Sequence, residues 1–294
     1  MKNLAIIIPT FNRKLFLFNL LNQITTIIHS EFCIDIIVVV DGSKDGTIEM
    51  ISENFDQVHI VKGTGEWWYT KSINKGLDHV KKLNTDYILT LNDDILLKNN
   101  FFEELHKAIV NSPKKSIIGA SSFTKTQPEK ILSLGVKEII LWRYKLIPYY
   151  KIFTDKKDVN SLKDLHHSEV LPGRGLLFPK EIVEIINGFD EKFPQYHSDY
   201  DFTLRAKKKG YKLYVCWDLI VYSFIEETGQ GTSYLNSSFK SFLKGFITKH
   251  SRLNIKDNAR YLFRHGHKLF FPITFSIFII SSFNSHFFKK KIND

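Results

Sequence analysis

Apolar runs alternate with stretches of helical spacing along the first half of the chain. Continuous apolar runs predict strands at residues 4–8, 34–40, 58–61 and 87–91. Between these runs, apolar side chains recur at helical spacing at about 15–28, from 47 onward and at 70–82. Apolar strands separated by helices are typical of parallel strands covered on both faces. The pattern therefore predicts an α/β fold with a mostly parallel central sheet flanked by helices.

The second half contains the same kinds of element at wider spacing. Short strands are predicted near 116–120, 139–144, 176–178 and 213–217, and a helix is predicted across 199–209. After residue 233 the pattern becomes helical and basic. We therefore expect a body of residues 1–235, divided into halves 1–118 and 119–235, and a helical C-terminal segment of residues 236–294.

Positive charge is concentrated in that C-terminal segment. The chain of 294 residues has 41 Lys and Arg against 31 Asp and Glu. Residues 236–294 hold 11 of the basic and 2 of the acidic residues, which leaves 30 and 29 for the first 235. A nearly neutral body with a basic end indicates a segment that meets an anionic surface. No nucleic-acid-binding signature accompanies the charge, so no nucleic-acid partner is expected.

The same segment carries an apolar run at 269–283, rich in Phe and Ile, and then Lys289, Lys290 and Lys291. The run is shorter than a spanning helix needs, and Pro272 interrupts it. Apolar side chains beside basic ones predict a segment that lies in a membrane interface. The alternative is a C-terminal helix that packs on the core and has a solvated basic end.

The cysteines and the N-terminus bear on the compartment. Cys33 and Cys216 lie far apart in apolar runs, which predicts reduced core residues rather than a disulfide. The first apolar run is too short for a secretory leader. We therefore expect a cytoplasmic protein that is peripheral on the cytoplasmic face of the membrane.

Two adjacent carboxylates, Asp93 and Asp94, follow the strand predicted at 87–91. Ligands of open α/β folds bind at this edge of the sheet. Carboxylate oxygens suit Mg²⁺ or Mn²⁺, which proteins commonly hold by one or two carboxylates together with substrate phosphates. An Asp-rich turn and helix cap is the alternative, since Asp favours both.

Other strand ends carry further candidate residues. The first strand leads into Pro9-Thr10-Phe11-Asn12-Arg13, and the second ends at Asp41 and Gly42. Asp41 is placed to accept a hydrogen bond from the imide N–H of uracil or thymine, although turn and capping chemistry would also explain it. Gly63-Thr64-Gly65 resembles a dinucleotide fingerprint, but the bulky Trp68 stands in the third glycine position and excludes that reading.

Charged residues also mark the second half. Arg174, at the centre of a Gly-rich loop, is a candidate for contact with a diphosphate or an acidic partner, and a surface position is the alternative. Asp199 and Asp201 flank Tyr200 at the start of a predicted helix, where the helix dipole favours negative charge. The functional interpretation makes one of them a general base in a pocket walled by Tyr196, His197 and Tyr200.

Four blocks in this order resemble the GT-A glycosyltransferases of the inverting family 2. They are Ile-Pro-Thr-Phe-Asn-Arg, Val-Asp-Gly-Ser-Lys-Asp-Gly-Thr, Leu-Asn-Asp-Asp, and Gly-Phe-Asp followed by Asp-Tyr-Asp-Phe-Thr-Leu-Arg-Ala. Gly65-Glu-Trp-Trp and Leu171-Pro-Gly-Arg-Gly further resemble bacterial rhamnosyltransferase-like enzymes of surface polysaccharide assembly. The resemblance implies a Rossmann-like GT-A catalytic domain over residues 1–235, with a nucleotide-binding half and an acceptor-binding half.

The resemblance also implies a role for each candidate residue. A UDP- or dTDP-sugar would be bound by Pro9, Thr10, Asn12, Arg13, Asp41, Gly42, Asp93 and Arg174. Asp93 and Asp94 would hold Mg²⁺ or Mn²⁺, with Asp94 the more direct ligand, and Asp199 would be the catalytic base. Trp67, Trp68, His197 and Tyr200 would line the sugar or acceptor pocket, although paired Trp residues also occur in cores.

The chain departs from the family pattern at two positions. Ser198 stands where many relatives have Glu before the base, and residues 220–223 offer no His where many relatives have a further metal ligand. His197 is a candidate substitute for that ligand. The resulting hypothesis is transfer of a sugar to a glycan or lipid-linked acceptor at the membrane. The alternatives are a sugar nucleotidyltransferase, which would carry a Gly-rich, basic loop after the first strand, and a non-catalytic glycan-binding protein.

Overall fold

A ten-stranded mixed sheet forms the centre of the protein. The computed structural model describes residues 1–27, 30–126, 129–159, 161–224 and 237–288. The main strand order is β10-β12-β6-β11-β4-β1-β2-β3, with β5 paired to β12 and β7 paired to β6. The strands are β1 (Lys2–Thr10), β2 (Phe32–Val40), β3 (Val58–Lys62), β4 (Tyr87–Thr90), β5 (Ile95–Leu97), β6 (Ser116–Thr124), β7 (Ile131–Ser133), β10 (Leu165–His167), β11 (Leu176–Pro179) and β12 (Lys212–Ser223).

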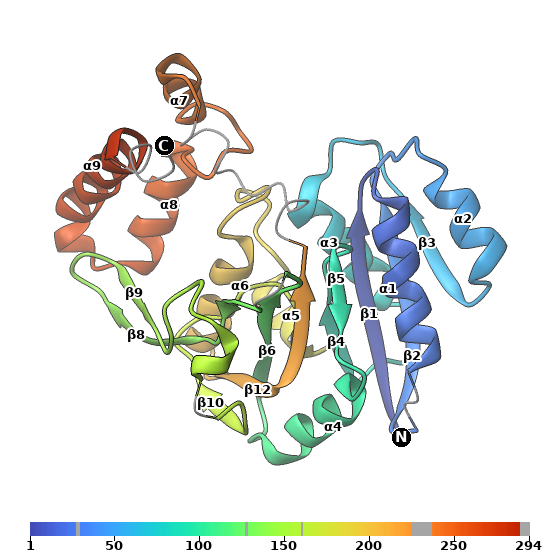
Figure 1. Cartoon of the computed structure of the whole chain (residues 1–294). Coiled ribbons are helices and arrows are strands. Elements are labelled where there is room, and N and C mark those ends of the chain that lie inside the picture. The colour runs from blue at the N-terminus through green and yellow to red at the C-terminus, as the bar shows by residue number, and fades with distance from the viewer. Residues whose placement is uncertain (28–29, 127–128, 160, 225–236, 289–294) are drawn as a thin grey trace.

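Helices cover both faces of this sheet, as the apolar runs predict (Figure 1). One face packs on α1 (Lys14–Thr26), α2 (Thr47–Asn54) and α4 (Phe101–Asn111). The other packs on α3 (Trp68–Val80), α5 (Ile182–Ile186) and α6 (Ser198–Lys208). Residues Leu4 to Ile8 of β1 are all fully buried, because alternate side chains enter the two cores.

The parallel half of the sheet fixes the position of the site. β1 pairs in parallel with both β2 and β4, and β2 pairs in parallel with β3. β11 is antiparallel to both β4 and β6, so the sheet is mostly parallel with antiparallel insertions, as predicted. From β1 the chain continues to β2 on one side, whereas β4 lies on the other side. Such a switch point in strand order opens a crevice at the carboxyl ends of the strands.

Three details of the sequence prediction are wrong. Residues 139–144 do not form one strand, because the chain turns between β8 (Val136–Ile140) and β9 (Lys145–Pro148), with a positive φ of 43° at Tyr144. Cys33 is exposed, because β3 begins to cover β2 only at Ile36; Cys216 is buried, as predicted, and both are free thiols. Pro272 does not interrupt a helix, since it lies in the first turn of α9, where proline is tolerated.

The C-terminal segment is helical, as predicted, and packs on the second half of the body. It comprises α7 (Phe239–Gly245), α8 (Ile255–His265), a short 3₁₀ turn at Lys268–Phe270 and α9 (Phe271–Phe288). Tyr261 and Leu262 of α8 share a buried cluster with Val170, Phe193 and Leu204 of the body. Figure 1 shows these helices at the end of the molecule opposite the N-terminus, which is the end that β1 points toward.

Candidate active site

The crevice between β1 and β4 contains an Arg–Asp–Asp cluster. The guanidinium Nη1 of Arg13, from the loop after β1, lies 3.0 Å from Asp93 Oδ1 and 3.0 Å from Asp94 Oδ2, which follow β4. Both carboxylates are buried. Burial raises the pKa of Asp93 to about 6; Arg13 opposes this rise and the charge of Asp94 adds to it. The parallel register of β1 and β4 thus brings together three of the predicted site residues.

The carboxylate oxygens of this cluster are suitable ligands for a divalent cation. Asp94 Oδ1 is buried and has no hydrogen-bond partner, so one carboxylate oxygen is left for a ligand. No group of three or more His, Cys, Asp and Glu able to hold a metal occurs among the described residues. A site with two carboxylates matches a cation that completes its coordination with substrate phosphates and water.

The end of β12 lies beside Asp94, and it carries no histidine. β5 pairs with the end of β12, and the Phe224 N–H donates to the Asp94 carbonyl at 3.2 Å, so the chain after β12 passes beside Asp94. Residues 225–236 lie outside the described residues. His197 does not act as the substitute ligand: its Nε2 is hydrogen-bonded to Asn258 Oδ1 at 3.1 Å, and its ring stacks on Tyr261 of α8. Burial lowers the pKa of His197 to about 4.

Asp41 organises the loop after β3. Its Oδ1 accepts the Gly65 N–H at 2.7 Å, and its Oδ2 accepts the N–H groups of Trp67 and Trp68 at 2.8 and 3.0 Å. Gly42 has a φ of +70°, and a Cβ there would lie 2.6 Å from the Gly65 nitrogen. Asp41 and Gly42 therefore hold this loop at the edge of the crevice, and a direct contact of Asp41 with a base stays a prediction.

Gly63 is a second point of close approach in this loop. A Cβ at Gly63 would lie 2.6 Å from Asp41 Oδ1 and 2.9 Å from the Trp67 ring. We expect Gly63→Ala to reduce the free energy of unfolding by about 1–3 kcal/mol through overpacking. In an Asp41→Ala background the same substitution should cost at least about 0.5 kcal/mol less, because the nearest of the three close contacts, Asp41 Oδ1, is gone while Asp41 Cα and the Trp67 ring remain. Urea denaturation of the four proteins in this cycle measures the coupling, and additive costs would contradict it.

The two tryptophans differ in their surroundings. Trp67 is partly buried on the α3 side of the sheet, with Lys71 and Lys75 within about 6 Å of its ring. Trp68 is exposed, has a positive φ of 58° and stacks on the His250 ring with centroids 3.4 Å apart. The loop after β3 therefore contacts the C-terminal segment through Trp68, a contact for which the sequence gives no signal.

Asp199 is held by two backbone groups. Its Oδ2 accepts the Gly173 N–H at 2.6 Å, and its Oδ1 accepts the Tyr200 N–H at 2.9 Å. Each carboxylate oxygen has a second lone pair, so proton uptake remains open. Burial raises the pKa of Asp199, although these hydrogen bonds and the charge of Arg174 oppose the rise. Asp199 thus has a higher proton affinity than an ordinary carboxylate, which suits a general base.

The Gly173 loop connects Asp199 with the end of β4. Leu176 pairs with Thr90, and Thr90 Oγ1 donates to the Gly173 carbonyl at 3.4 Å. A Cβ at Gly173 would overlap the Tyr69 hydroxyl oxygen and lie 3.4 Å from Asp199 Cβ, so a larger residue there would have to displace Tyr69. Burial, aided by the Asp199 charge, raises the pKa of the Tyr69 hydroxyl. Neither Tyr69 nor Gly173 is predicted from the sequence as a residue of the site.

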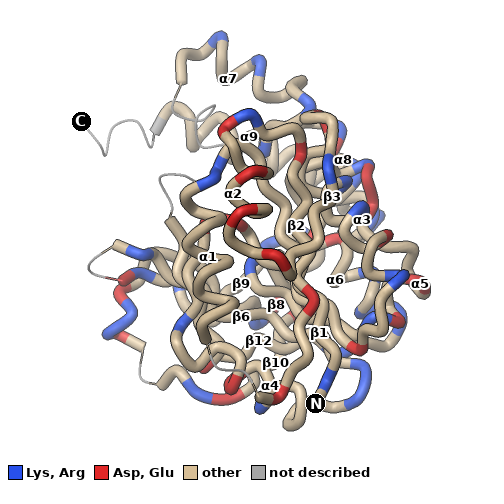
Figure 2. Tube along the Cα trace, turned by 90° about the vertical axis from the view of Figure 1, so that its right-hand side faces the viewer, with Lys and Arg blue, Asp and Glu red and all other residues tan. Residues whose placement is uncertain are grey.

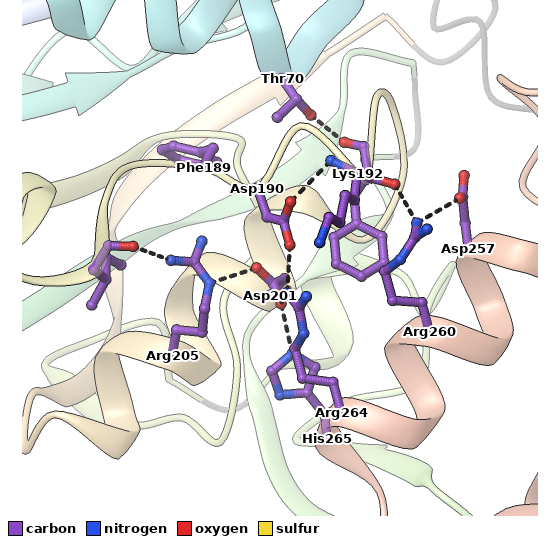
Figure 3. Close-up of polar contacts among 12 residues, drawn as sticks. Thr70, Phe189, Asp190, Lys192, Asp201, Arg205, Asp257, Arg260, Arg264 and His265 are labelled. Carbon is purple, nitrogen blue, oxygen red and sulfur yellow. Dashed lines mark hydrogen bonds and ion pairs between the residues drawn. The ribbon is translucent and has the colours of Figure 1, made fainter.

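Asp201 has a structural position, which separates it from Asp199. It is fully buried, and its Oδ2 accepts from Arg205 Nε at 2.6 Å while its Oδ1 accepts from Arg264 and His265 of α8 at 2.7 and 2.8 Å. Arg264 also pairs with Asp190 at 2.7 Å (Figure 3). The Gly-Phe-Asp and Asp-Tyr-Asp motifs are thus joined to α8, and Asp199 is the acid of the pair that remains for chemistry.

Tyr200 and Arg174 are close enough to Asp199 to interact with it electrostatically. Burial and the Asp199 charge raise the pKa of Tyr200 to about 12, so its hydroxyl remains protonated at neutral pH. Arg174 is partly exposed and forms no ion pair with a carboxylate in the part of the chain that the structure describes. Its charge acts on both Asp199 and Tyr200. The Gly-rich loop therefore places the guanidinium group of Arg174 near Asp199, the candidate base.

The sequence model of one protein family, described as "Glycosyltransferase like family 2", matches residues 2–243. This covers most of the chain. The protein belongs to glycosyltransferase family 2. The glycosyltransferase has no significant match among curated protein sequences.

Solved structures of other glycosyltransferases share its GT-A fold. A structure of GalNAc-T7 with UDP, GalNAc and Mn²⁺ superposes with a TM-score of 0.63 at 12% identity, over 95% of this chain and 58% of that one. The mannosyltransferase PcManGT from Pyrobaculum calidifontis, in complex with GDP-Man and Mn²⁺, gives a TM-score of 0.54 at 14% identity, over 95% and 74%. Both neighbours were solved with Mn²⁺ and a nucleotide or nucleotide sugar.

Proposed function

We propose that this glycosyltransferase moves a sugar from a UDP- or dTDP-sugar to a hydroxyl of a glycan or lipid-linked acceptor and inverts the anomeric configuration. The observation that carries the proposal is the meeting of the buried Asp93–Asp94 pair and the backbone-held Asp199 at one edge of the sheet. Two acidic centres of different environment suit two roles: one that receives a cation and one that receives a proton.

The nucleotide part of the donor is assigned to the strand ends β1 to β3. Thr10 ends β1, Asn12 lies in the loop after it, and Asp41 directly follows β2. The Asn12 side chain accepts the Lys44 N–H at 2.8 Å, which joins the two loops. Pro9 and Gly42 shape these loops. Arg13 is the cation nearest to the Asp pair and would face the diphosphate. Mg²⁺ or Mn²⁺ at Asp94 and Asp93 would supply Lewis-acid stabilisation of the departing nucleoside diphosphate.

The acceptor side is assigned to Asp199 and its neighbours. Asp199 takes the proton of the acceptor hydroxyl as that oxygen forms its bond to the anomeric carbon, opposite the bond that breaks to the diphosphate. Attack from the opposite face inverts the configuration. Tyr200, Trp67 and Trp68 offer aromatic surface for the sugars, whereas His197 is engaged with α8 and acts on this wall only by positioning it.

The two alternative functions fit the site less well. A sugar nucleotidyltransferase would need a Gly-rich, basic loop after β1, but the single basic residue of Pro9–Arg13 is bound to Asp93 and Asp94. A non-catalytic glycan-binding protein would have no use for a half-buried carboxylate of raised pKa such as Asp199. The resemblance to rhamnosyltransferase-like enzymes and the basic C-terminal segment support a role in cell-surface polysaccharide synthesis at the cytoplasmic face of the membrane.

The test is transfer or donor hydrolysis by the purified protein with UDP- and dTDP-sugars and Mn²⁺. We expect Asp94→Ala to lower turnover at least about 100-fold, because several kcal/mol of charge stabilisation in the transition state are lost. Mn²⁺ titration by calorimetry should show a parallel loss of metal affinity. Asp86→Ala is the control: it removes an exposed carboxylate that directly precedes β4, at the end of the strand away from Asp94. It should leave both the turnover and the Mn²⁺ affinity unchanged. Full activity in Asp94→Ala would contradict the metal role.

A further inference from the structure

Helix α9 has an unusual distribution of polar and apolar side chains. The polar residues Thr274, Ser282 and His286 are buried against the protein. The large apolar residues Ile273, Ile277, Ile280 and Phe287 are exposed, at a spacing that places them in one stripe along the helix. A surface helix in water shows the reverse arrangement. The outer side of α9 is therefore suited to a medium other than water.

Helix α7 and the turn after it continue this surface. Phe239, Leu243 and Ile247 recur at intervals of one helical turn and are all exposed. The exposed rings of Phe239 and Phe287 lie 5.8 Å apart, so the stripes of the two helices meet. We call these seven side chains the apolar face: Phe239, Leu243, Ile247, Ile273, Ile277, Ile280 and Phe287. An apolar patch of this extent on a soluble protein marks an interaction site.

Basic residues accompany the apolar face. Lys240 and Lys244 alternate with its members on α7, and Lys268 directly precedes α9; all three are exposed. Figure 2 shows Lys and Arg along α7 and no Asp or Glu there. Within the described residues 237–288, Asp257 is the single carboxylate, and it is paired with Arg260. Apolar side chains set among cations match the boundary between acyl chains and anionic headgroups.

The packing of α9 favours a position in the plane of a bilayer over a spanning one. By length and composition, Lys268–Phe287 is the one helix in the described part of the chain able to cross a membrane, and 17% of it is buried in protein. Its inner side is nevertheless fixed, since Phe278 contacts Phe246 and Phe283 contacts Phe242 of α7, while Phe271 contacts Phe263 of α8. A crossing α9 would draw the charged α8 into the hydrocarbon or break these contacts.

We infer that the apolar face of α7 and α9 docks into the interface of an anionic phospholipid bilayer. The inference goes beyond the proposed transfer reaction, and the binding it describes does not depend on catalysis. It also orients the enzyme. α9 packs on α8, and Asn258 and Tyr261 of α8 contact His197 at the start of α6, two residues before Asp199. Docking through α9 would thus bring the acceptor side of the site toward the headgroups, where a lipid-linked acceptor presents its sugar.

Vesicle co-sedimentation with the full chain tests the inference. The wild type should bind vesicles of mixed phosphatidylcholine and phosphatidylglycerol, more weakly at high salt and with phosphatidylcholine alone. Ile277→Asp should lower the partition coefficient at least about tenfold, because a charge replaces an exposed apolar side chain that would enter the bilayer interface. Val110→Asp makes a similar change at an exposed site on α4, away from the C-terminal helices, and should bind as the wild type does.

Two further measurements keep the outcome decisive. The double variant Lys240→Glu, Lys244→Glu leaves the apolar stripe intact, and its vesicle binding should no longer depend on phosphatidylglycerol. It therefore tests membrane binding even if Ile277→Asp fails to fold. Asp199→Asn should still bind vesicles, which separates this inference from the proposed function. Absent binding of the wild type, or equal binding of Ile277→Asp, would overturn it. Sedimentation velocity gives a further contradicting outcome: a wild-type dimer that becomes monomeric in Ile277→Asp. In that case a second copy of the chain, rather than a bilayer, would cover the apolar face.

Discussion

Asp199→Asn should lower the rate of sugar transfer by about 10²–10⁴-fold while leaving the affinity for the nucleotide sugar within a factor of about three. The substitution keeps the size of the side chain and one of its two backbone hydrogen bonds, but it removes the group that takes the acceptor proton. Single-turnover rates and calorimetric donor affinities separate the two effects. Glu191→Gln, an exposed carboxylate on the preceding loop, is the matched control and should retain full activity.

The pH profile provides an independent check on the same residue. Because burial raises the pKa of Asp199, its carboxyl stays protonated to a higher pH than the ordinary value of about 3.9. The wild-type kcat/KM should therefore fall as the pH decreases through this raised pKa, with a single-proton slope. The residual activity of Asp199→Asn should lack that acidic limb. An unchanged limb in the variant would assign the base to another residue.

Asp201→Ala should lower the free energy of unfolding by about 3–5 kcal/mol, the cost of breaking a buried ion pair from one side. Asp201 is fully buried, and its loss leaves Arg205, Arg264 and His265 without their shared carboxylate. Urea denaturation measures the change. Asp78→Ala removes an exposed carboxylate paired with Lys75 and Lys81 and should cost at most about 1 kcal/mol. Equal costs for the two variants would contradict the structural role of Asp201.

The pH dependence of stability follows from the same cluster. Burial alone raises the pKa of Asp201, but the hydrogen bonds from His265, Arg205 and Arg264 and the charge of Arg205 outweigh it and lower the pKa to about 2. The folded pKa is thus below the unfolded value of about 3.9. The ionised carboxylate stabilises the fold above pH of about 4, and this contribution is lost as the pH falls toward 2. The acid limb of wild-type stability should be shallower in Asp201→Ala.

Local sequence patterns predicted the strands and the candidate loops of the body, because both are encoded by residues that are close together in the chain. Each strand of the parallel half is a run of buried side chains, and each candidate loop follows such a strand directly. The carboxyl ends of parallel strands must lie at one edge, so the proximity of Arg13 to Asp93 and Asp94 follows once the strand order is known. Strand order itself is a long-range property and could not be deduced from spacing.

Other features depend on contacts between distant segments, which spacing does not reveal. Asp199 and Asp201 have the same local sequence environment, and only their contacts separate them: Asp201 binds Arg264 and His265 of α8, whereas Asp199 accepts the Gly173 N–H. The stacking of Trp68 on His250 joins residues from opposite ends of the chain. Composition indicated an apolar segment at α9. Which of its side chains face the protein and which face outward follows only from its packing on α7 and α8.

The partners of Asp201 also have a consequence for synthesis on the ribosome. Arg264 and His265 lie 63 and 64 residues after it, near the end of the chain. Domains fold from the N-terminus as they emerge, so α6 is complete while two of the three partners of its buried carboxylate are still unmade. Until α8 has been made, Arg205 alone of the three is present to pair with the Asp201 carboxylate. The full set of contacts around Asp201 therefore forms late in synthesis, after the strands of the central sheet have been made.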